Sequence, residues 1–223
     1  MIFPPLIFLV MAIFFVMALL MLPFLLVGAI GEAFSRLGLS PGMVFWLLIL
    51  TLAGSLVNIP IHTLETQEVI GGQVISYFGM RVRLPAAPRT RKTVLAVNVG
   101  GAVIPAFLSL YLLSRMPFTL ALPILLGGMI VIMYHLARPV KGLGIAVPGL
   151  IPPILAALGA WLLCPEGLRA PTAYIASTMG TLIGADLLKL NEIGQLGAPV
   201  ASIGGAGTFD AIFLSGIIAV LLS

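Results

Sequence analysis

Seven long apolar stretches divide the chain, and short segments rich in polar residues, glycine or proline separate them. Most stretches reach the roughly 20 residues with which a helix crosses the hydrocarbon core of a bilayer. Backbone groups in lipid must be satisfied internally, so only helices or closed barrels can cross, and barrel strands alternate apolar with polar residues. These stretches are continuously apolar, so the pattern predicts an all-α membrane protein with about seven transmembrane helices. The predicted spans are residues 4–28, 43–62, 94–114, 118–135, 145–163, 171–190 and 199–222.

Two of the predicted spans have features of their own. Residues 4–28 lack a basic segment before the apolar run, which predicts a retained first span rather than a cleaved signal peptide. Residues 145–163 contain Pro148, Pro152 and Pro153. Since prolines interrupt the hydrogen bonds of a helix, this span is expected to be kinked or partly unwound.

Composition supports a lipid environment for the whole chain, residues 1–223, as a single transmembrane domain. Hydrophobic residues make up 61% of the chain and charged residues 8%, with a mean hydropathy of +1.22. A soluble domain carries about 25% charged residues. The net charge of +4 comes without a basic helix or an aromatic-basic repeat, so nucleic acid is not an expected partner. The single cysteine, Cys164, excludes an internal disulfide and a multi-cysteine metal site.

Basic residues are distributed unequally between the two sides that the alternating spans define. The side shared with the N-terminus receives eight of them and the opposite side three. Because loops rich in Lys and Arg stay in the cytoplasm, the N-terminus is predicted to be cytoplasmic and the C-terminus outside the cell membrane. The eight are Arg81, Arg83, Arg89, Arg91, Lys92, Arg138, Lys141 and Lys189, and the three are Arg36, Arg115 and Arg169.

Residues 63–93 form the one sizeable polar loop of this topology, on the predicted cytoplasmic side. Gly71 and Gly72 stand between two runs of β-favouring residues, a pattern typical of a small β-hairpin. Residues 85–92 follow as a basic, proline-containing linker that is expected to lie against anionic lipid headgroups. The hairpin is either a surface feature or an edge strand that receives an extended peptide by strand addition.

Only two of the seven acidic residues, Asp186 and Asp210, lie inside predicted spans. An aspartate in the middle of a membrane helix costs about 2.5–3.5 kcal/mol on insertion scales, so both need compensation. Asp186 could pair with Lys189 at position i+3 of the same helix, which would give it a purely structural role. No Lys, Arg or His lies between Lys189 and the C-terminus, so Asp210 needs a partner from another helix, from water or from a second carboxyl group.

The segment between the two aspartates predicts an interrupted helix. Residues 191–209 contain five glycines and one proline, and non-helical backbone at membrane depth must be buried in protein or line a wet cavity. Thr208 is a suitable N-cap for the last helix, which places Asp210 close to the start of that helix. Both carboxyl groups are then expected at similar depth near cytoplasmic helix ends. The residues predicted to shape this site are Pro105, Gly184, Pro199, Gly204, Gly205, Gly207 and Thr208.

Two carboxyl groups that share one water molecule can hydrolyse a peptide bond. Like charges about 3 Å apart cannot both ionise, so one group stays protonated while the other is anionic. The anion takes a proton from water, and the neutral acid protonates the carbonyl oxygen of the substrate. Asp186 and Asp210 are therefore the candidate catalytic residues of an intramembrane aspartyl protease, whose partners are a transmembrane protein or peptide substrate and the lipid bilayer.

One segment, Gly205-Ala206-Gly207-Thr208-Phe209-Asp210-Ala211-Ile212-Phe213, is similar to the second motif of the GxGD-type intramembrane aspartyl proteases, such as presenilin and signal peptide peptidase. The resemblance implies a presenilin-like arrangement of the last two spans, with Asp186 and Asp210 as catalytic residues. The sequence departs from the class pattern, because two residues separate the last glycine from Asp210 and alanine rather than tyrosine precedes Asp186. The Pro-Ala-Leu motif of the class has its nearest counterpart in Pro105-Ala106-Phe107, on an earlier span.

The chain as a whole also resembles an uncharacterised family of prokaryotic multi-pass membrane proteins. This second resemblance covers nearly all residues and implies no particular activity. The segments typical of that family are Asn98-Val99-Gly100-Gly101-Ala102, Gly184-Ala185-Asp186-Leu187 and Gly204-Gly205-Ala206-Gly207-Thr208-Phe209-Asp210.

Other functions fit the same residues. Broken helices, paired acids and proline-containing spans are also typical of a proton- or cation-coupled transporter, in which the two aspartates would be ion sites. A weak internal similarity, in which Val99-Gly100-Gly101-Ala102 matches Ile203-Gly204-Gly205-Ala206, fits a transporter and a protease equally. A scaffold without chemistry is the third alternative.

The remaining polar residues predict no cofactor. His62 and His135 fall at predicted span ends without a cluster of further imidazoles or thiols, so no metal site is expected. Asn58 and Asn98 are amides inside predicted spans, where hydrogen bonding between helices is their expected use. The oligomeric state is left open by the sequence.

Overall fold

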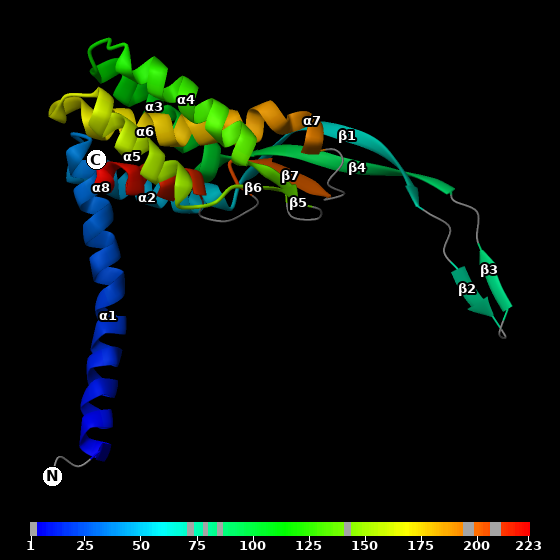
Figure 1. Ribbon diagram of the computed structural model, residues 1–223, viewed down its shortest axis with the longest axis horizontal. Helices are drawn as coiled ribbons and strands as arrows, with labels where there is room; N and C mark the ends of the chain where they lie inside the picture. Colours follow the sequence, from blue (N-terminus) through cyan, green and yellow to red (C-terminus); the bar gives the residue numbers. More distant parts are fainter. Residues whose placement is uncertain are drawn as a thin grey trace.

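A long N-terminal helix, a bundle of shorter helices and a small β-sheet make up the protein (Figure 1). The computed structural model describes residues 4–70, 74–77, 80–83, 87–140, 144–193, 199–205 and 211–223. The helices are α1 (Pro4–Arg36), α2 (Pro41–Ser55), α3 (Ile104–Arg115), α4 (Ala121–Leu136), α5 (Ile151–Leu163), α6 (Glu166–Thr181), α7 (Leu190–Ile193) and α8 (Ala211–Leu222). The π-helical turns are η1 (Val99–Val103) and η2 (Leu182–Asp186), and η3 (Leu187–Lys189) is a 3₁₀ turn. The strands are β1 (Asn58–Ile70), β2 (Val74–Tyr77), β3 (Met80–Arg83), β4 (Ala87–Asn98), β5 (Arg138–Val140), β6 (Gly144–Ala146) and β7 (Val200–Ile203).

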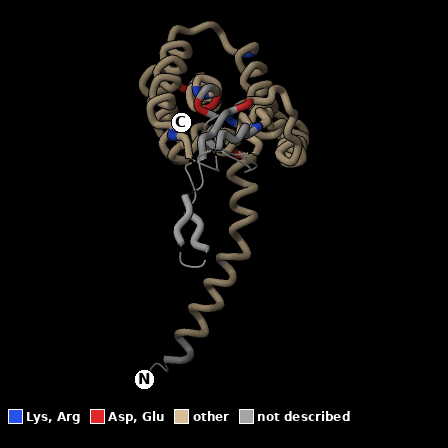
Figure 2. The backbone as a smooth tube through the Cα atoms, turned by 90° about the vertical axis from the view of Figure 1, so that its right-hand side faces the viewer, with Lys and Arg blue, Asp and Glu red and all other residues tan. Residues whose placement is uncertain are grey.

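The helix α1 projects away from the rest of the protein (Figure 1). Its segment Phe8–Arg36 is the one helix in the described part of the chain that is both long and apolar enough to cross a membrane. The described side chains from Phe8 to Met17 and from Leu19 to Val27 are exposed, and Figure 2 shows no charged residue on the part of the helix that extends from the body. An exposed apolar helix of this length suits a lipid environment.

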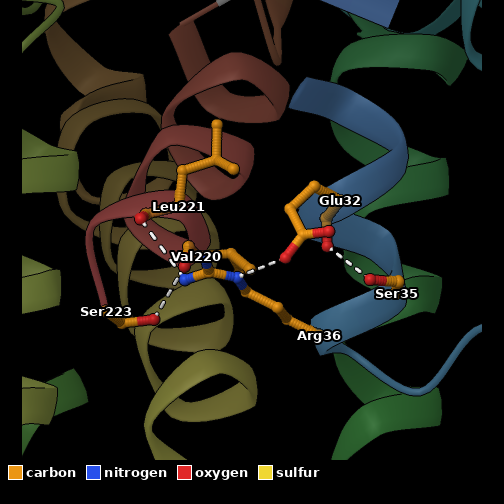
Figure 3. Close-up of polar contacts among 6 residues, drawn as sticks. All are labelled: Glu32, Ser35, Arg36, Val220, Leu221 and Ser223. Carbon is orange, nitrogen blue, oxygen red and sulfur yellow. Dashed lines mark hydrogen bonds and ion pairs between the residues drawn. The ribbon is translucent and has the colours of Figure 1, made fainter. Parts of the chain in front are cut away.

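The last turns of α1 attach it to the C-terminal helix α8. Phe34 is fully buried, and its ring centroid lies 6.1 Å from that of Phe213. The guanidinium of Arg36 forms an ion pair with Glu32 at 3.2 Å and also donates to the carbonyl oxygen of Leu221 at 3.5 Å (Figure 3). Aromatic packing and an arginine bridge therefore join the first helix to the last.

The helix α6 is the centre of the bundle. It packs against α3, α4, α5 and α8, and all its residues from Pro171 to Thr178 are buried. A helix that is covered on every side needs no apolar stripe, so it can carry hydroxyl-bearing side chains in place of leucines. One of them, Ser177, lies with its Oγ 2.5 Å from the Oγ of Ser215 on α8. The bundle is therefore organised around a buried and partly polar helix.

The predicted spans are helical only in part. In the stretches 43–62 and 94–114 one end belongs to a β-strand, so the prediction of continuous helices there is wrong. In 145–163 and 199–222, where prolines and glycines predict an interruption, one end is also a strand. Apolar residues predict burial, whereas the β-branched residues at these ends, such as those of β4 and β7, favour a strand when a partner strand is present. The helical parts that remain, α2, α3, α4, α5, α6 and α8, are 12–16 residues long.

A three-stranded sheet in the order β1-β4-β7 lies where the bundle helices α2 and α3 meet. Strands β1 and β4 are antiparallel, with a bulge beside Pro60, whose missing N–H suits a bulge in an edge strand. Strand β7 runs parallel to β4, with Val94 opposite Val200 and Val97 opposite Ile203. The sheet thereby joins two predicted spans that are far apart in the sequence.

Strands β1 and β4 continue outward from this sheet as a long arm, and β2 and β3 form its outer part (Figure 1). A hairpin in this region is confirmed, but its predicted turn is wrong. Ile70 pairs with Ala87 and Val74 with Arg83, so the two runs that flank the predicted glycine turn pair with later strands instead of with each other. Gly71 and Gly72 lie outside the described residues.

The predicted basic linker is a strand over most of its length. Residues from Ala87 to Lys92 belong to β4, because pairing with β1 along the arm overrides the weak preference of a proline-containing basic segment for an irregular form. Glu65 lies opposite Lys92, and their side chains form an ion pair of 2.9 Å. The hydrogen bond and the charge of Lys92 lower the pKa of Glu65 below its ordinary value.

We predict that Lys92→Met raises the pKa of Glu65 towards that of a free glutamate. Because the folded-state pKa is lowered, the pair stabilises the arm above the ordinary pKa of glutamate, and this contribution is lost as the pH falls through the lowered value. Carboxyl ¹³C NMR titration of the protein in micelles measures the shift. Lys189→Met, which removes a distant cation, serves as the control. An unchanged Glu65 titration in Lys92→Met contradicts the pairing.

Glycines let three backbone segments meet, namely the end of α2, η1 and the turn after β7. A Cβ at Gly100 would lie 2.2 Å from the carbonyl oxygen of Thr51, and a Cβ at Gly101 would lie 1.9 Å from that of Gly204. Both neighbours are backbone atoms, so neither distance can be relieved by a change of rotamer. The sheet and the bundle are therefore joined at a point where only glycine fits.

Gly101→Ala is expected to destabilise the protein by about 3 kcal/mol or more, at the upper end of overpacking substitutions, because the backbone of Gly204 must move. Gly127→Ala is the matched control, since Gly127 lies inside α4 with nothing within 4 Å of the added Cβ. That control is expected to be neutral or stabilising by about 0.5–1 kcal/mol. Thermal unfolding in detergent, followed by circular dichroism, compares the two. Equal melting temperatures for both variants contradict the close approach.

Candidate functional site

Asp186 is the last residue of the π-helical turn η2, immediately after the central helix α6. It is half-buried, and its Oδ2 accepts a hydrogen bond of 2.8 Å from the backbone N–H of Gly204. Wide π-helical turns occur within helices mostly where they place a functional group. The carboxyl group of Asp186 is thus attached to the glycine turn that follows β7.

In the structure the ammonium group of Lys189 binds groups other than the predicted partner, Asp186. The Nζ of Lys189 donates to the carbonyl oxygen of Ala137 at 2.7 Å and lies 3.8 Å from a carboxylate oxygen of Glu192. It also lies 5.1 Å from the ring centroid of Tyr134. The i+3 argument assumes an α-helix, whereas here a π turn gives way to a 3₁₀ turn, so Lys189 is directed towards α4 and Glu192.

Gly204 and Gly205 form the turn that faces Asp186. Their φ angles are +88° and +108°, in the region that side chains other than glycine rarely adopt. A Cβ on Gly204 would also lie 2.6 Å from the Cβ of Ala102. The prediction that both glycines shape the site is consistent with this geometry, because the turn brings the N–H of Gly204 to the carboxylate.

Gly184 and the two predicted prolines have packing roles in the structure. A Cβ on Gly184 would lie 2.5 Å from the carbonyl oxygen of Ile130, so this glycine lets α4 approach the turn that carries Asp186. Pro105 is buried in the first turn of α3. The carbonyl oxygen of Pro199 accepts a 3.0 Å hydrogen bond from the N–H of Val94, which fixes the start of β7 against β4.

The other predicted site residues, Asp210, Gly207 and Thr208, lie outside the described residues. The described residues on either side of their segment both contact the turn of Asp186. On one side Gly204 bonds to Asp186 itself, and on the other side Ile212 belongs to the same buried cluster as Leu182, the first residue of η2. Described residues before and after this segment therefore lie in the region of the turn that carries Asp186.

A polar network that the sequence did not connect lies at the root of the arm. Asn98 is buried, and its Nδ2 donates to the carbonyl oxygen of Ser55 at 2.7 Å and to Oδ1 of Asn58 at 3.1 Å. The Oδ1 of Asn58 also accepts from the hydroxyl of Ser202 at 2.6 Å. The two amides form hydrogen bonds, but the expectation that they link helices is wrong, because Asn58 lies in β1 and Asn98 in β4. The role of Ser202 could not be predicted from the sequence, because the strands β1 and β4 beside it are remote in the chain.

This network leads directly to the site. The Oδ1 of Asn98 accepts from the N–H of Gly101 at 2.7 Å and thereby caps η1. Gly101 in turn touches the carbonyl of Gly204, whose N–H binds Asp186. Asn98 consequently holds the glycine turn from one side while Asp186 holds it from the other.

Among the described residues, no three His, Cys, Asp or Glu side chains come together in a group that could hold a metal ion. The chemistry available at this site is that of a half-buried carboxylate, backbone N–H groups, amides and hydroxyls. Such a set can bind and orient water or a peptide group, and with a second carboxyl group it can move protons.

The fold and site define a helical protein with a long exposed apolar helix and an aspartate on a π-helical turn beside a mixed sheet. Residues 52–222 match the model of the family described as protein of unknown function (DUF1614), and the chain belongs to that family. The matched region includes the arm, the amide network and both aspartates. No curated protein and no solved structure is significantly similar to the chain. The resemblance to GxGD proteases therefore rests on the local motifs alone.

We predict that Asn98→Ala loosens the glycine turn. Removal of the amide leaves the buried N–H of Gly101 without its acceptor, which costs about 1–3 kcal/mol of stability. Amide hydrogen exchange at Gly101 and Gly204 is expected to accelerate. Ser109→Ala is the control, because Ser109 is equally buried but bonds only to the carbonyl of Pro105 within its own helix. Similar exchange rates in both variants contradict a positioning role for Asn98.

Proposed function

We propose that this protein is a multi-pass membrane hydrolase that cleaves transmembrane peptides with an Asp186 and Asp210 dyad. The observation that supports the proposal best is the 2.8 Å hydrogen bond from Gly204 to Asp186. It ties the first aspartate to the glycine turn that directly precedes the second. A structural aspartate at the end of a polar helix does not require this bond to a strained, glycine-only turn.

In the proposed arrangement the six shorter helices cross the membrane together with α1. Helices of 12–16 residues measure about 18–24 Å at 1.5 Å per residue, less than the roughly 30 Å of hydrocarbon. The apolar ends of β1, β4 and β7 and the π turn η2 complete the crossing. Asp186 then lies below the cytoplasmic surface, at the level where helices give way to strands. Irregular backbone at such depth suits a water-accessible recess.

The two aspartates take different parts in the proposed reaction. A carboxylate that accepts a backbone N–H is stabilised as the anion, so Asp186 is the base and Asp210 the acid. Asp186 takes a proton from a water molecule, whose oxygen attacks the carbonyl carbon of the peptide. Asp210 gives its proton to the carbonyl oxygen. Breakdown of the tetrahedral intermediate breaks the C–N bond. The proton held by Asp186 passes to the leaving amine, and one hydroxyl of the intermediate returns a proton to Asp210, so both carboxyl groups regain their starting states.

A proton- or cation-coupled transporter is the second candidate, and one feature favours it. The buried helix α6 carries the hydroxyl groups of Ser177, Thr178 and Thr181 along one side of its last turns, and these lead to the turn of Asp186. Polar groups along a membrane helix are typical of proton and ion pathways. In that case Asp186 would bind the coupling ion instead of activating water.

Charge-conserving substitution separates the two candidates. We predict that Asp186→Asn and Asp210→Asn each lower the cleavage of a fluorogenic transmembrane peptide by roughly 10²–10⁴-fold, the usual contribution of a positioned acid or base. Asp→Glu at either position is expected to inactivate the enzyme as well, because it changes the geometry of the shared water. The assay uses purified protein reconstituted in vesicles.

Glu192→Gln is the matched control, since Glu192 is the nearest described acidic residue along the chain and contacts Lys189. It is expected to retain cleavage. Peptide cleavage that survives both Asp→Asn substitutions eliminates the protease proposal. Ion-dependent uptake that survives Asp→Glu but not Asp→Asn favours the transporter.

A further inference from the structure

An apolar groove runs along α2 and α3. Its volume is about 700 Å³. Trp46 and Phe107, 62% and 68% exposed, form its rims, while Leu108 is buried in its floor. The polar atoms of its lining side chains are the hydroxyls of Ser40 and Tyr111 and the indole N–H of Trp46.

The two ends of the groove differ in polarity, and the antiparallel course of α2 and α3 determines which residues lie at each end. Gly54 near the end of α2 touches Gly100 just before α3, which places Leu50 and Ile104 at one end of the groove. Ser40, the N-cap of α2, and Tyr111, in the last part of α3, lie at the opposite end. One end of the groove is therefore apolar, and the other bears hydroxyl groups.

Arg115 lies at the hydroxyl-bearing end. Its guanidinium carbon is 5.3 Å from the ring centroid of Tyr111. Within the described part of the chain no carboxylate is at ion-pair distance from Arg115. The two other cations on this side are engaged with protein groups. Arg36 binds Glu32, and Arg169 lies 3.9 Å from Glu166 and donates to the carbonyl oxygen of Cys164.

We propose that this groove binds an anionic phospholipid, with one acyl chain between α2 and α3 and the phosphate on Arg115. A free guanidinium at one end of an apolar channel matches a molecule that is charged at one end and apolar along its length. Arginine binds phosphate through paired N–H donors, and the exposed aromatic rims suit contact with acyl chains. The inference rests on the membrane-spanning arrangement proposed above and is independent of the aspartate chemistry.

The chain contains two tryptophans, and they provide a matched pair of reporters. Trp46 lines the proposed lipid groove, whereas Trp161 lies on α5, where the guanidinium of Arg169 is 5.7 Å from its ring. Single-tryptophan proteins made by Trp161→Phe or Trp46→Phe therefore report on one site each. In the first site the arginine is free to bind phosphate, and in the second it is held by Glu166 and Cys164.

The experiment measures quenching of tryptophan fluorescence by brominated lipids. The full chain is reconstituted in vesicles that mix phosphatidylglycerol with phosphatidylcholine, with one of the two lipids brominated. At Trp46 we expect phosphatidylglycerol to bind about fivefold more strongly than phosphatidylcholine, which corresponds to about 1 kcal/mol for one basic residue near anionic lipid. Arg115→Gln is expected to abolish this preference and Arg115→Lys to retain most of it.

At Trp161 we expect no preference and no effect of Arg169→Gln. Equal binding of both lipids at Trp46 overturns the proposal, as does a preference that Arg115→Gln leaves intact. A similar preference at Trp161 overturns it too, because the effect would then be a general surface charge. Quenching of Trp46 that falls with protein concentration in the membrane, whatever the lipid, would assign the groove to a second copy of the chain instead. Loss of aspartate activity leaves all of these outcomes unchanged.

Discussion

The contact between the backbones of Gly101 and Gly204 is the constraint on which the rest of this structure depends. It brings the sheet, the π turn before α3 and the glycine turn after β7 to one point. On the side of the arm, Asn98 accepts a hydrogen bond from the N–H of Gly101, and on the side of the central helix, Asp186 accepts one from the N–H of Gly204. An ordinary side chain at either glycine separates these elements, so the carboxylate owes its position to the absence of two Cβ atoms.

The two ends of the helical bundle have different chemistry. At one end helices give way to strands, and amides, hydroxyls, Asp186 and Lys189 gather among irregular backbone. At the other end the helices stop in short turns, and the cations Arg36, Arg115 and Arg169 lie near aromatic rings or carbonyl groups. The proposed function uses the first end for proton transfer and hydrogen bonding to a peptide, and the proposed lipid site uses the second end for contact with a headgroup.

Much of this arrangement could be predicted from apolar patterning, and the failures have specific physical causes. The boundaries of α4 and the break before Asp210 follow from runs of apolar residues and from glycine and proline. The sheet could not be predicted in this way. A strand such as β7 is extended because it pairs with β4, and the local pattern of Val200–Ile203 does not indicate which strand is its partner. Asp186 could be found as an acid in an apolar stretch. Its hydrogen-bond partner, Gly204, could be identified only from the tertiary structure. The same holds for the direction of Lys189, which changes because α-helical geometry gives way to a π turn.

The parallel pairing of β4 with β7 also sets an order of assembly. Val94 leaves the ribosome long before Val200, and contacts between such distant segments form slowly because a large loop must close first. During synthesis the edge of β4 that pairs with β7 therefore lacks its partner strand while α3, α4, α5 and α6 are made. The hydrogen bond between Gly204 and Asp186 is among the last to form, so the carboxylate is completed as a site only when the final helix has docked.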